Sequence, residues 1–345
     1  MALEVPVPPP GARPRPEDRP PVEVADASPM AEEGLDGGSS DRKVTRVVAA
    51  DVSVWHRLAE IWRSRELLVY LVRTEIKVKY KNSFLGLIWS MIAPAMTLAV
   101  YTIVFGFFLK NGIPNFVIFL FSGLLLWNFF QTGVITATGV VVNNAGLVKK
   151  VSFPREILAL AAIGSAGVFL FFQSCVMVLF MLVLHVVPAW GLLWLLLVAL
   201  IPTVVFSAAL GIFLASVNVY LRDTQHLVEV LVGAAWFWAC PIVYSYQHTV
   251  ATKLSQHHIF GVPLTDLYFL NPITPVVMTF QRVLYNKMGT VKLTTPNHVK
   301  AVLLPPWPWT TYVIADCIVL AVSVVLAYLA LVVFGRLAGN FAEEL

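Results

Sequence analysis

Six long apolar runs constrain this chain of 345 residues more than any other feature. A membrane-spanning helix needs about 20 apolar residues, whereas soluble cores are built from shorter segments. Hydrophobic residues make up 58% of the sequence and charged residues only 13%, about half the charged share of a soluble enzyme. We therefore predict an all-α membrane protein with six transmembrane helices, at residues 85–109, 116–142, 157–187, 190–217, 227–246 and 310–334.

Lysine and arginine residues near these runs indicate the orientation, because cytoplasmic loops carry an excess of both. With the N-terminus inside, the inner side holds ten such residues and the short outer turns hold only Lys110. We predict a multi-pass plasma-membrane protein with both termini cytoplasmic and an outer segment at 247–309. The basic residues then reflect membrane orientation rather than nucleic-acid binding. The ten are Arg65, Arg73, Lys77, Lys79, Lys81, Lys149, Lys150, Arg155, Arg222 and Arg336.

Three regions follow one another along the chain. Residues 1–50 begin with nine of the 22 prolines and many acids, which predicts a disordered cytoplasmic tail. Residues 51–82 mix apolar and basic residues at helical spacing, which predicts an amphipathic helix at the membrane interface. Residues 83–345 form the transmembrane domain. Pro94, Pro202 and Pro241 fall inside its apolar runs and predict kinks or breaks.

A shorter amphipathic segment interrupts the predicted outer segment. Its apolar residues fall at positions 276, 277, 280, 283 and 284, within Pro275 to Lys287. That length cannot cross a bilayer. We predict a re-entrant or interfacial helix before the last transmembrane helix.

The sequence contains no recognised catalytic motif, neither a phosphate-binding glycine loop nor a zinc or serine-nucleophile signature. We therefore assign no catalytic residue, no metal ligand and no cofactor to this chain. A membrane glycosyltransferase with its active site in the outer segment is one alternative. Such an enzyme needs essential acids there, and residues 247–309 contain only Asp266.

The inner loop after the second apolar run, NNAGLVKKVSFPREIL, carries a dense set of apolar and basic residues. Leu147, Val148 and Val151 can form an apolar edge beside Lys149 and Lys150. Pro154 and Glu156 suit the first turn of the next helix. The loop is either a positively charged inner loop with a helix start, or a coupling helix that docks on another protein.

Aromatic residues gather in the second and fifth apolar runs. Aromatic faces contact sugar C–H surfaces, so Trp127, Phe130, Trp236 and Tyr244 are candidates to line a channel, although aromatic residues also fill helix interfaces. Asp316 lies inside the last run, where an ionisable group is costly. It either faces the protein interior or a water-filled path, or is hydrated near the outer interface.

Several motifs together resemble the permease subunits of ABC-2 type polysaccharide exporters, the O-antigen and teichoic-acid family. The resemblance rests on the approach to the first run (Leu71 to Gly106), the loop LVKKVSFPREIL, and the segments NVYLRD, WFWACPIVY and LNPITPVV, in family order. The acidic proline-rich tail and residues 251–265 are similar to a mycobacterial branch that exports lipid-linked galactan.

The resemblance implies a homodimeric permease, in contact with membrane lipids, that moves a lipid-linked glycan outward across the plasma membrane. Two copies of a separate ABC ATPase subunit, which binds ATP and Mg²⁺, would supply the energy. An exporter of a smaller lipid or drug is the alternative within transport. The family's interface helix maps onto residues 55–80, and its ATPase-coupling region onto Asn143, Leu147, Lys149, Lys150, Phe153, Pro154, Arg155 and Glu156.

Overall fold

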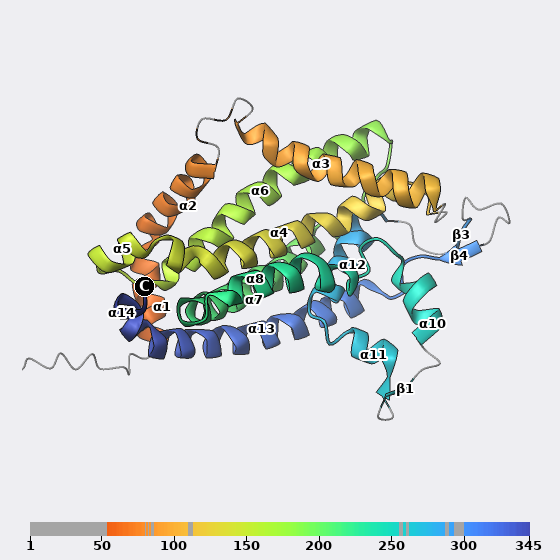
Figure 1. The fold of residues 1–345 in the computed structure, drawn as a ribbon. Helices are drawn as coiled ribbons and strands as arrows, with labels where there is room; N and C mark the ends of the chain where they lie inside the picture. Colours follow the sequence, from red (N-terminus) through yellow and green to blue (C-terminus); the bar gives the residue numbers. More distant parts are fainter. Residues whose placement is uncertain are drawn as a thin grey trace, which may run out of the picture. The chain divides into compact units, whose positions relative to one another are not determined.

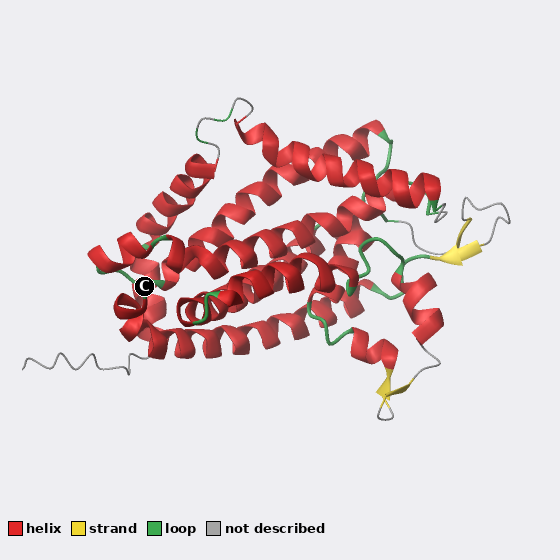
Figure 2. Cartoon of the chain, in the orientation of Figure 1, coloured by secondary structure: helices red, strands yellow, loops and turns green. Residues whose placement is uncertain are grey.

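The computed structural model describes residues 54–345 except 80, 82, 84–85, 110–112, 255–257, 260–261, 287–289 and 293–299. The predicted tail at 1–50 and Lys110 therefore lie outside the described residues. Figure 1 shows a bundle of long helices, and Figure 2 shows that strands are confined to two small hairpins. The hairpins pair β1 (His258–Ile259) with β2 (Val262–Pro263) and β3 (Thr290–Lys292) with β4 (Lys300–Val302).

Five helical segments in the described part of the chain are long and apolar enough to cross a membrane, which confirms the predicted all-α membrane class. The first joins α3 (Trp89–Tyr101) to the π-helical η3 (Thr102–Phe108), after the short η2 (Gly86–Ile88). The others are α4 (Phe116–Asn143), α6 (Glu156–Val183), α7 (Trp194–Tyr220), preceded by η4 (Trp190–Leu192), and α13 (Trp309–Leu337).

The predicted fifth span, 227–246, is not one continuous helix, so that expectation needs correction. Helical structure runs through α8 (Asp223–Val230), the π-helical η5 (Leu231–Ala235) and α9 (Trp236–Trp238), and then ends. Pro241 lacks an N–H group and disfavours helical geometry in the residue before it. Pro94 and Pro202, by contrast, lie inside α3 and α7.

The helix α12 (Ile273–Leu284) lies in the interior of the bundle, and its re-entrant or interfacial position in a membrane stays a prediction. Every residue of it except Arg282 is buried, and it packs against α4, α7 and α13. Its polar side chains find partners inside the bundle: Gln281 donates from Nε2 to the Pro241 carbonyl at 2.8 Å. The remaining short helices of the predicted outer segment are η6 (Tyr246–Ala251), α10 (Thr252–Leu254) and α11 (Leu264–Tyr268).

The predicted interface helix is two helices, α1 (Val54–Arg63) and α2 (Arg65–Lys79), separated by Ser64. Neither contains a buried residue. α2 packs on α6 at Gly164, where an added Cβ would lie 2.8 Å from Val72 Cγ2. At the end of the chain, η7 (Ala338–Asn340) and α14 (Phe341–Glu344) follow α13.

The most deeply buried of the long helices is α4. In its most apolar window 78% of the residues are buried, against 28% for α13 and 6% for the α3 segment. It packs against α6 on one side and α7 on another, as Figure 1 shows. Small residues permit the close approach: a Cβ on Gly211 of α7 would lie 2.8 Å from Ala137 Cβ of α4.

We predict that Gly211→Ala lowers the stability of the bundle. The added methyl group overlaps Ala137, so α4 and α7 must separate, at a cost of about 1–3 kcal/mol. Thermal unfolding of the detergent-solubilised protein measures the effect. Gly167→Ala is the matched control, because its Cβ would meet only Phe129 at 3.9 Å. An unchanged melting temperature in Gly211→Ala would contradict the tight packing of these two helices.

Candidate functional site

The inner loop forms a short helix that presents two lysines to solvent. α5 (Ala145–Lys150) directly follows α4, and the Asn144 carbonyl accepts hydrogen bonds from the N–H groups of Leu147 and Val148. Val148 is buried against the bundle, whereas Lys149 and Lys150 are exposed. Val151, just beyond the helix, is also exposed. The loop therefore offers a basic surface with an apolar edge.

The second half of the loop turns back into the bundle. Phe153 is partly buried against the core. Arg155 donates from Nη1 to the Ala338 carbonyl, and its guanidinium lies 5.6 Å from the ring centroid of Phe341. Burial lowers the pKa of Arg155, and the neighbouring Glu156 carboxylate opposes this shift. These contacts attach the loop to the C-terminal helix α14.

Glu156 attaches the same loop to the first helix. Its carboxylate accepts a hydrogen bond from Arg57 of α1 at 2.7 Å, and its side chain is only 4% exposed. Gly335 of α13 makes room for this pair, because a Cβ there would lie 2.5 Å from Arg57 Cζ. We call Arg57, Arg155, Glu156 and Phe341 the basal clamp. It joins α1, α6 and α14 beside α5, with Gly335 of α13 packed against Arg57.

The structure therefore divides the eight predicted coupling residues into those that face solvent and those that contact the bundle. Lys149 and Lys150 face outward together with Asn143, while Leu147 and Pro154 are half-buried. Phe153, Arg155 and Glu156 are engaged with the bundle. Their coupling roles stay predictions, and the geometry gives the two groups different tasks: contact with a partner and attachment to the other helices.

The two predicted aromatic clusters form one packed cluster. Trp127 and Phe130 of α4 are at most 1% exposed, and the Phe130 ring lies 5.2 Å from Trp236 of α9. Phe206 of α7 stacks on Phe130 at 5.7 Å. Trp236 donates from Nε1 to Asn271 Oδ1 at 2.9 Å. Within one chain these rings fill the bundle interior, so their channel-lining role stays a prediction.

Tyr244 and Asp316 make hydrogen bonds of their own. The Tyr244 hydroxyl donates to the Trp238 carbonyl at 2.7 Å and lies 3.1 Å from the Tyr268 hydroxyl. Asp316 is 1% exposed, so it lies in the protein interior rather than at a hydrated surface. Thr279 of α12 donates to Asp316 Oδ2 at 2.9 Å, and Oδ1 has no hydrogen-bond partner within the described residues. This bond ties α12 to α13.

A polar groove runs along the opposite side of α4, between α2, α3, α4 and α6. It consists of two cavities of about 480 Å³ and 490 Å³ that share Lys79, Thr132 and Phe169. The first reaches Asn143 at the end of α4, and the second reaches Gln173 in the middle of α6. Polar side chains are costly at membrane depth and mark substrate paths in transporters.

Regular spacing on the two facing helices builds this groove. Asn128, Thr132 and Thr136 recur every four residues on α4, which places them on one face of the helix. Ser165 and Gln173 lie at multiples of the same spacing on α6. Asn128 donates from Nδ2 to Gln173 Oε1 at 3.2 Å, across the two helices. The sequence interpretation missed these residues, although their spacing within apolar runs was a usable signal.

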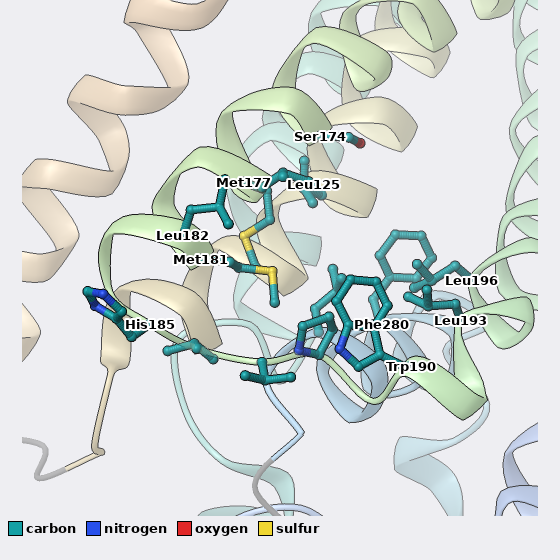
Figure 3. A pocket seen from close by; sticks show the side chains of 15 residues that line it. Leu125, Ser174, Met177, Met181, Leu182, His185, Trp190, Leu193, Leu196 and Phe280 are labelled. Carbon is teal, nitrogen blue, oxygen red and sulfur yellow. The ribbon is translucent and has the colours of Figure 1, made fainter.

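A third cavity, of about 550 Å³, has a different character. It lies between α4, α6, α7 and α12, and its lining is almost wholly apolar. Figure 3 shows Met177 and Met181 pointing into it and His185 at one edge. Such a lining suits hydrocarbon rather than sugar.

Comparison with known proteins identifies the family. The family model described as ABC-2 type transporter matches residues 66–285, which is more than half of the chain. The chain belongs to the ABC-2 type transporter family. The match runs from α2 to the end of α12, so it includes the polar groove, α5 and α12. Asp316 and α14 lie beyond it.

Relatives of this ABC-2 chain are permeases. It is 32% identical over 238 residues to the O-antigen export system permease protein RfbA of Myxococcus xanthus, covering 66% of this chain and 83% of that protein. It is 28% identical over 180 residues to the O-antigen export system permease protein RfbA of Klebsiella pneumoniae, covering 52% and 69%. The resemblance seen in the sequence motifs is thereby confirmed at the level of the family.

We predict that Thr279 and Asp316 are energetically coupled. Thr279→Val should destabilise the protein by about 1–3 kcal/mol, because it removes the donor to a buried carboxylate. The same change should cost much less in an Asp316→Leu background, where no carboxylate remains. Thermal unfolding of the two single variants and the double variant measures this coupling.

Thr138→Val provides the matched control for this cycle. Within the part of the chain that the structure describes, the Thr138 hydroxyl donates to the Val134 carbonyl of its own helix, at 2.8 Å. Its effect should therefore add to that of Asp316→Leu. If the losses of stability caused by Thr279→Val and Asp316→Leu are also additive, their hydrogen bond does not hold α12 against α13.

Proposed function

We propose that this chain is the membrane subunit of an ATP-driven exporter that moves a polysaccharide outward across the plasma membrane. The observation that carries the proposal is the ABC-2 match over residues 66–285, together with relatives that are O-antigen export permeases. The sequence contains no phosphate-binding loop of its own. Energy then comes from a separate ABC ATPase subunit that binds ATP and Mg²⁺.

The exposed part of the inner loop supports the docking of that ATPase. Lys149, Lys150 and Val151 point away from the bundle beside the basal clamp. A partner with acidic residues around an apolar pocket would complement this surface. We propose two ATPase copies on a homodimer of this chain, one for each α5. Movement of α5 then reaches α1 and α14 through Glu156 and Arg155.

The polar groove supports a saccharide as the cargo. Amide and hydroxyl side chains such as Asn128, Thr132 and Gln173 offer hydrogen bonds at membrane depth, which an exporter of a small apolar drug does not need. We propose a lipid-linked glycan as the substrate. The similarity of residues 251–265 to the galactan-exporting branch makes lipid-linked galactan the narrower proposal.

In this proposal the α5 end of the bundle is cytoplasmic, and both termini lie inside. The fifth predicted span does not form a long helix, so topology is the most direct test of the arrangement. Cysteine substitutions at His226, at the start of α8, and at Leu270, which is 80% exposed, should react with an impermeant thiol reagent from opposite sides. Native Cys175, Cys240 and Cys317 are replaced first. Labelling of both sites from one side would contradict the topology.

We predict that Lys149→Glu combined with Lys150→Glu weakens the complex with the ATPase. Charge reversal turns attraction into repulsion at the docking surface, so co-purification of the ATPase should fall at least tenfold, with loss of glycan at the cell surface. The control is Lys77→Glu with Lys81→Glu. It reverses two exposed charges near the same membrane face, away from α5.

This control separates docking from membrane insertion, because both double variants change the positive charge at the cytoplasmic face equally. The docking proposal expects loss only in the Lys149 and Lys150 variant. Normal co-purification and normal export in that variant would overturn it. Equal loss in both variants would assign the effect to insertion and would overturn it too.

A further inference from the structure

Lys79 occupies a special place in the polar groove. It is the last residue of α2 and lines both cavities of the groove. Its Nζ lies 4.4 Å from the centroid of the Phe169 ring of α6. The ammonium therefore lies where the interface helix meets the transmembrane helices, over an aromatic face that favours a cation.

No carboxylate of the described residues lies within ion-pair distance of Lys79. The nearest acid along α2 is Glu75, one helical turn earlier and half-buried in the same groove. Partial desolvation beside the groove lowers the pKa of Lys79, although its side chain stays exposed, and raises the pKa of Glu75; each charge partly offsets the shift of the other. Both groups would gain from an additional polar partner in the groove.

Lys77, on the same helix, gives an internal comparison. It is exposed, as Lys79 is, but it lines neither cavity of the groove. The two lysines carry the same charge and lie two residues apart near the end of α2. A ligand that binds in the groove depends on Lys79, whereas a ligand attracted only by the basic surface depends on both.

We propose that the groove binds the phosphate-bearing headgroup of the lipid-linked substrate, with Lys79 contacting the phosphate and the first sugars lying along α4 and α6. This inference rests on the proposed export of a lipid-linked glycan. It names the chemical class that the groove recognises and the residue that recognises its charge. The lysine ammonium serves as a point charge for phosphate.

The arrangement of the groove fits such an amphiphile. The positive charge lies at the end of α2. In the proposed topology this end of the interface helix lies at the level of lipid headgroups, where anionic groups are found. Thr132 is shared by both cavities, and beyond it the groove leads to the Asn128–Gln173 hydrogen bond. Trp89 and Phe169 add aromatic faces for sugar C–H contacts. The hydrocarbon tail stays in the surrounding membrane.

Binding to the whole exporter tests the proposal. The complex with its ATPase is placed in nanodiscs of uncharged phosphatidylcholine, and native mass spectrometry measures the binding of a polyprenyl phosphate. Uncharged polyprenol is the probe without phosphate. Lys79→Gln should weaken polyprenyl phosphate binding about tenfold, as expected for the loss of one charge-assisted contact. Lys77→Gln should bind as the unaltered protein does, and Lys79→Arg should retain most of the affinity.

We expect Glu75→Gln to change the affinity for polyprenyl phosphate in the opposite direction from Lys79→Gln. Removing the competing carboxylate should strengthen binding of polyprenyl phosphate by several-fold, without altering polyprenol binding. Equal weakening in Lys79→Gln and Lys77→Gln, or no change in Lys79→Gln, would overturn the proposal. So would equal competition by phosphatidylglycerol, because the groove would then bind any anionic lipid.

The same set of variants separates this inference from the proposed function. If Lys79→Gln binds the probe normally while cells lacking the chain lose their surface glycan, the headgroup site is wrong and the export function stands. If cells lacking the chain keep normal surface glycan, the export function itself is wrong. If Lys77→Gln keeps normal export at low substrate levels while Lys79→Gln exports less, the result supports both the headgroup site and the export function.

Discussion

The absence of hydrogen-bond partners in hydrocarbon is the constraint on which this structure depends. α4 carries Asn128, Thr132 and Thr136 among mostly apolar residues, and hydrocarbon cannot satisfy their hydrogen bonds. Other helices surround α4, so Asn128 finds Gln173 and the other two face the groove rather than lipid. The same constraint acts on α12. As a helix too short to cross the membrane, it is buried, and its Gln281 binds the carbonyl of Pro241. The polar residues of α4 and α12 thus favour the burial of these two helices within the bundle.

The basal clamp divides one loop into an exposed part and an attached part. Lys149 and Lys150 are exposed, but Arg155 and Glu156, a few residues further on, are fixed to α14 and α1. A buried ion pair such as Arg57–Glu156 contributes little net stability, but removing one partner leaves a buried charge. The helices that it joins therefore tend to move together. In a transporter, this is the property needed where an ATPase acts on a membrane subunit.

The two kinds of cavity lie at different levels along α4 and α6. The groove beside α2 and α6 is polar and carries Lys79, whereas the cavity beside α7 and α12 is apolar and is lined by Met177 and Met181. The proposed amphiphilic substrate would need both kinds of surface in one protein. The aromatic cluster around Phe130 packs between α4, α7 and α9. It keeps these helices together instead of opening a path between them within one chain.

The sequence by itself determined the membrane class and the approximate positions of the five long helical segments, because apolar length alone decides which segments can enter a bilayer. It also placed a buried or interfacial helix before α13 and a basic loop after α4. It did not determine that the helical structure within 227–246 ends at Trp238. Hydropathy measures only how apolar a segment is and does not report the hydrogen bonds that proline removes. Nor did it determine that Arg155 and Glu156 turn inward, that Trp127 and Trp236 belong to one cluster, or that Lys79 lines a groove. Each of these depends on contacts between residues far apart in the chain, and only tertiary packing brings those residues together.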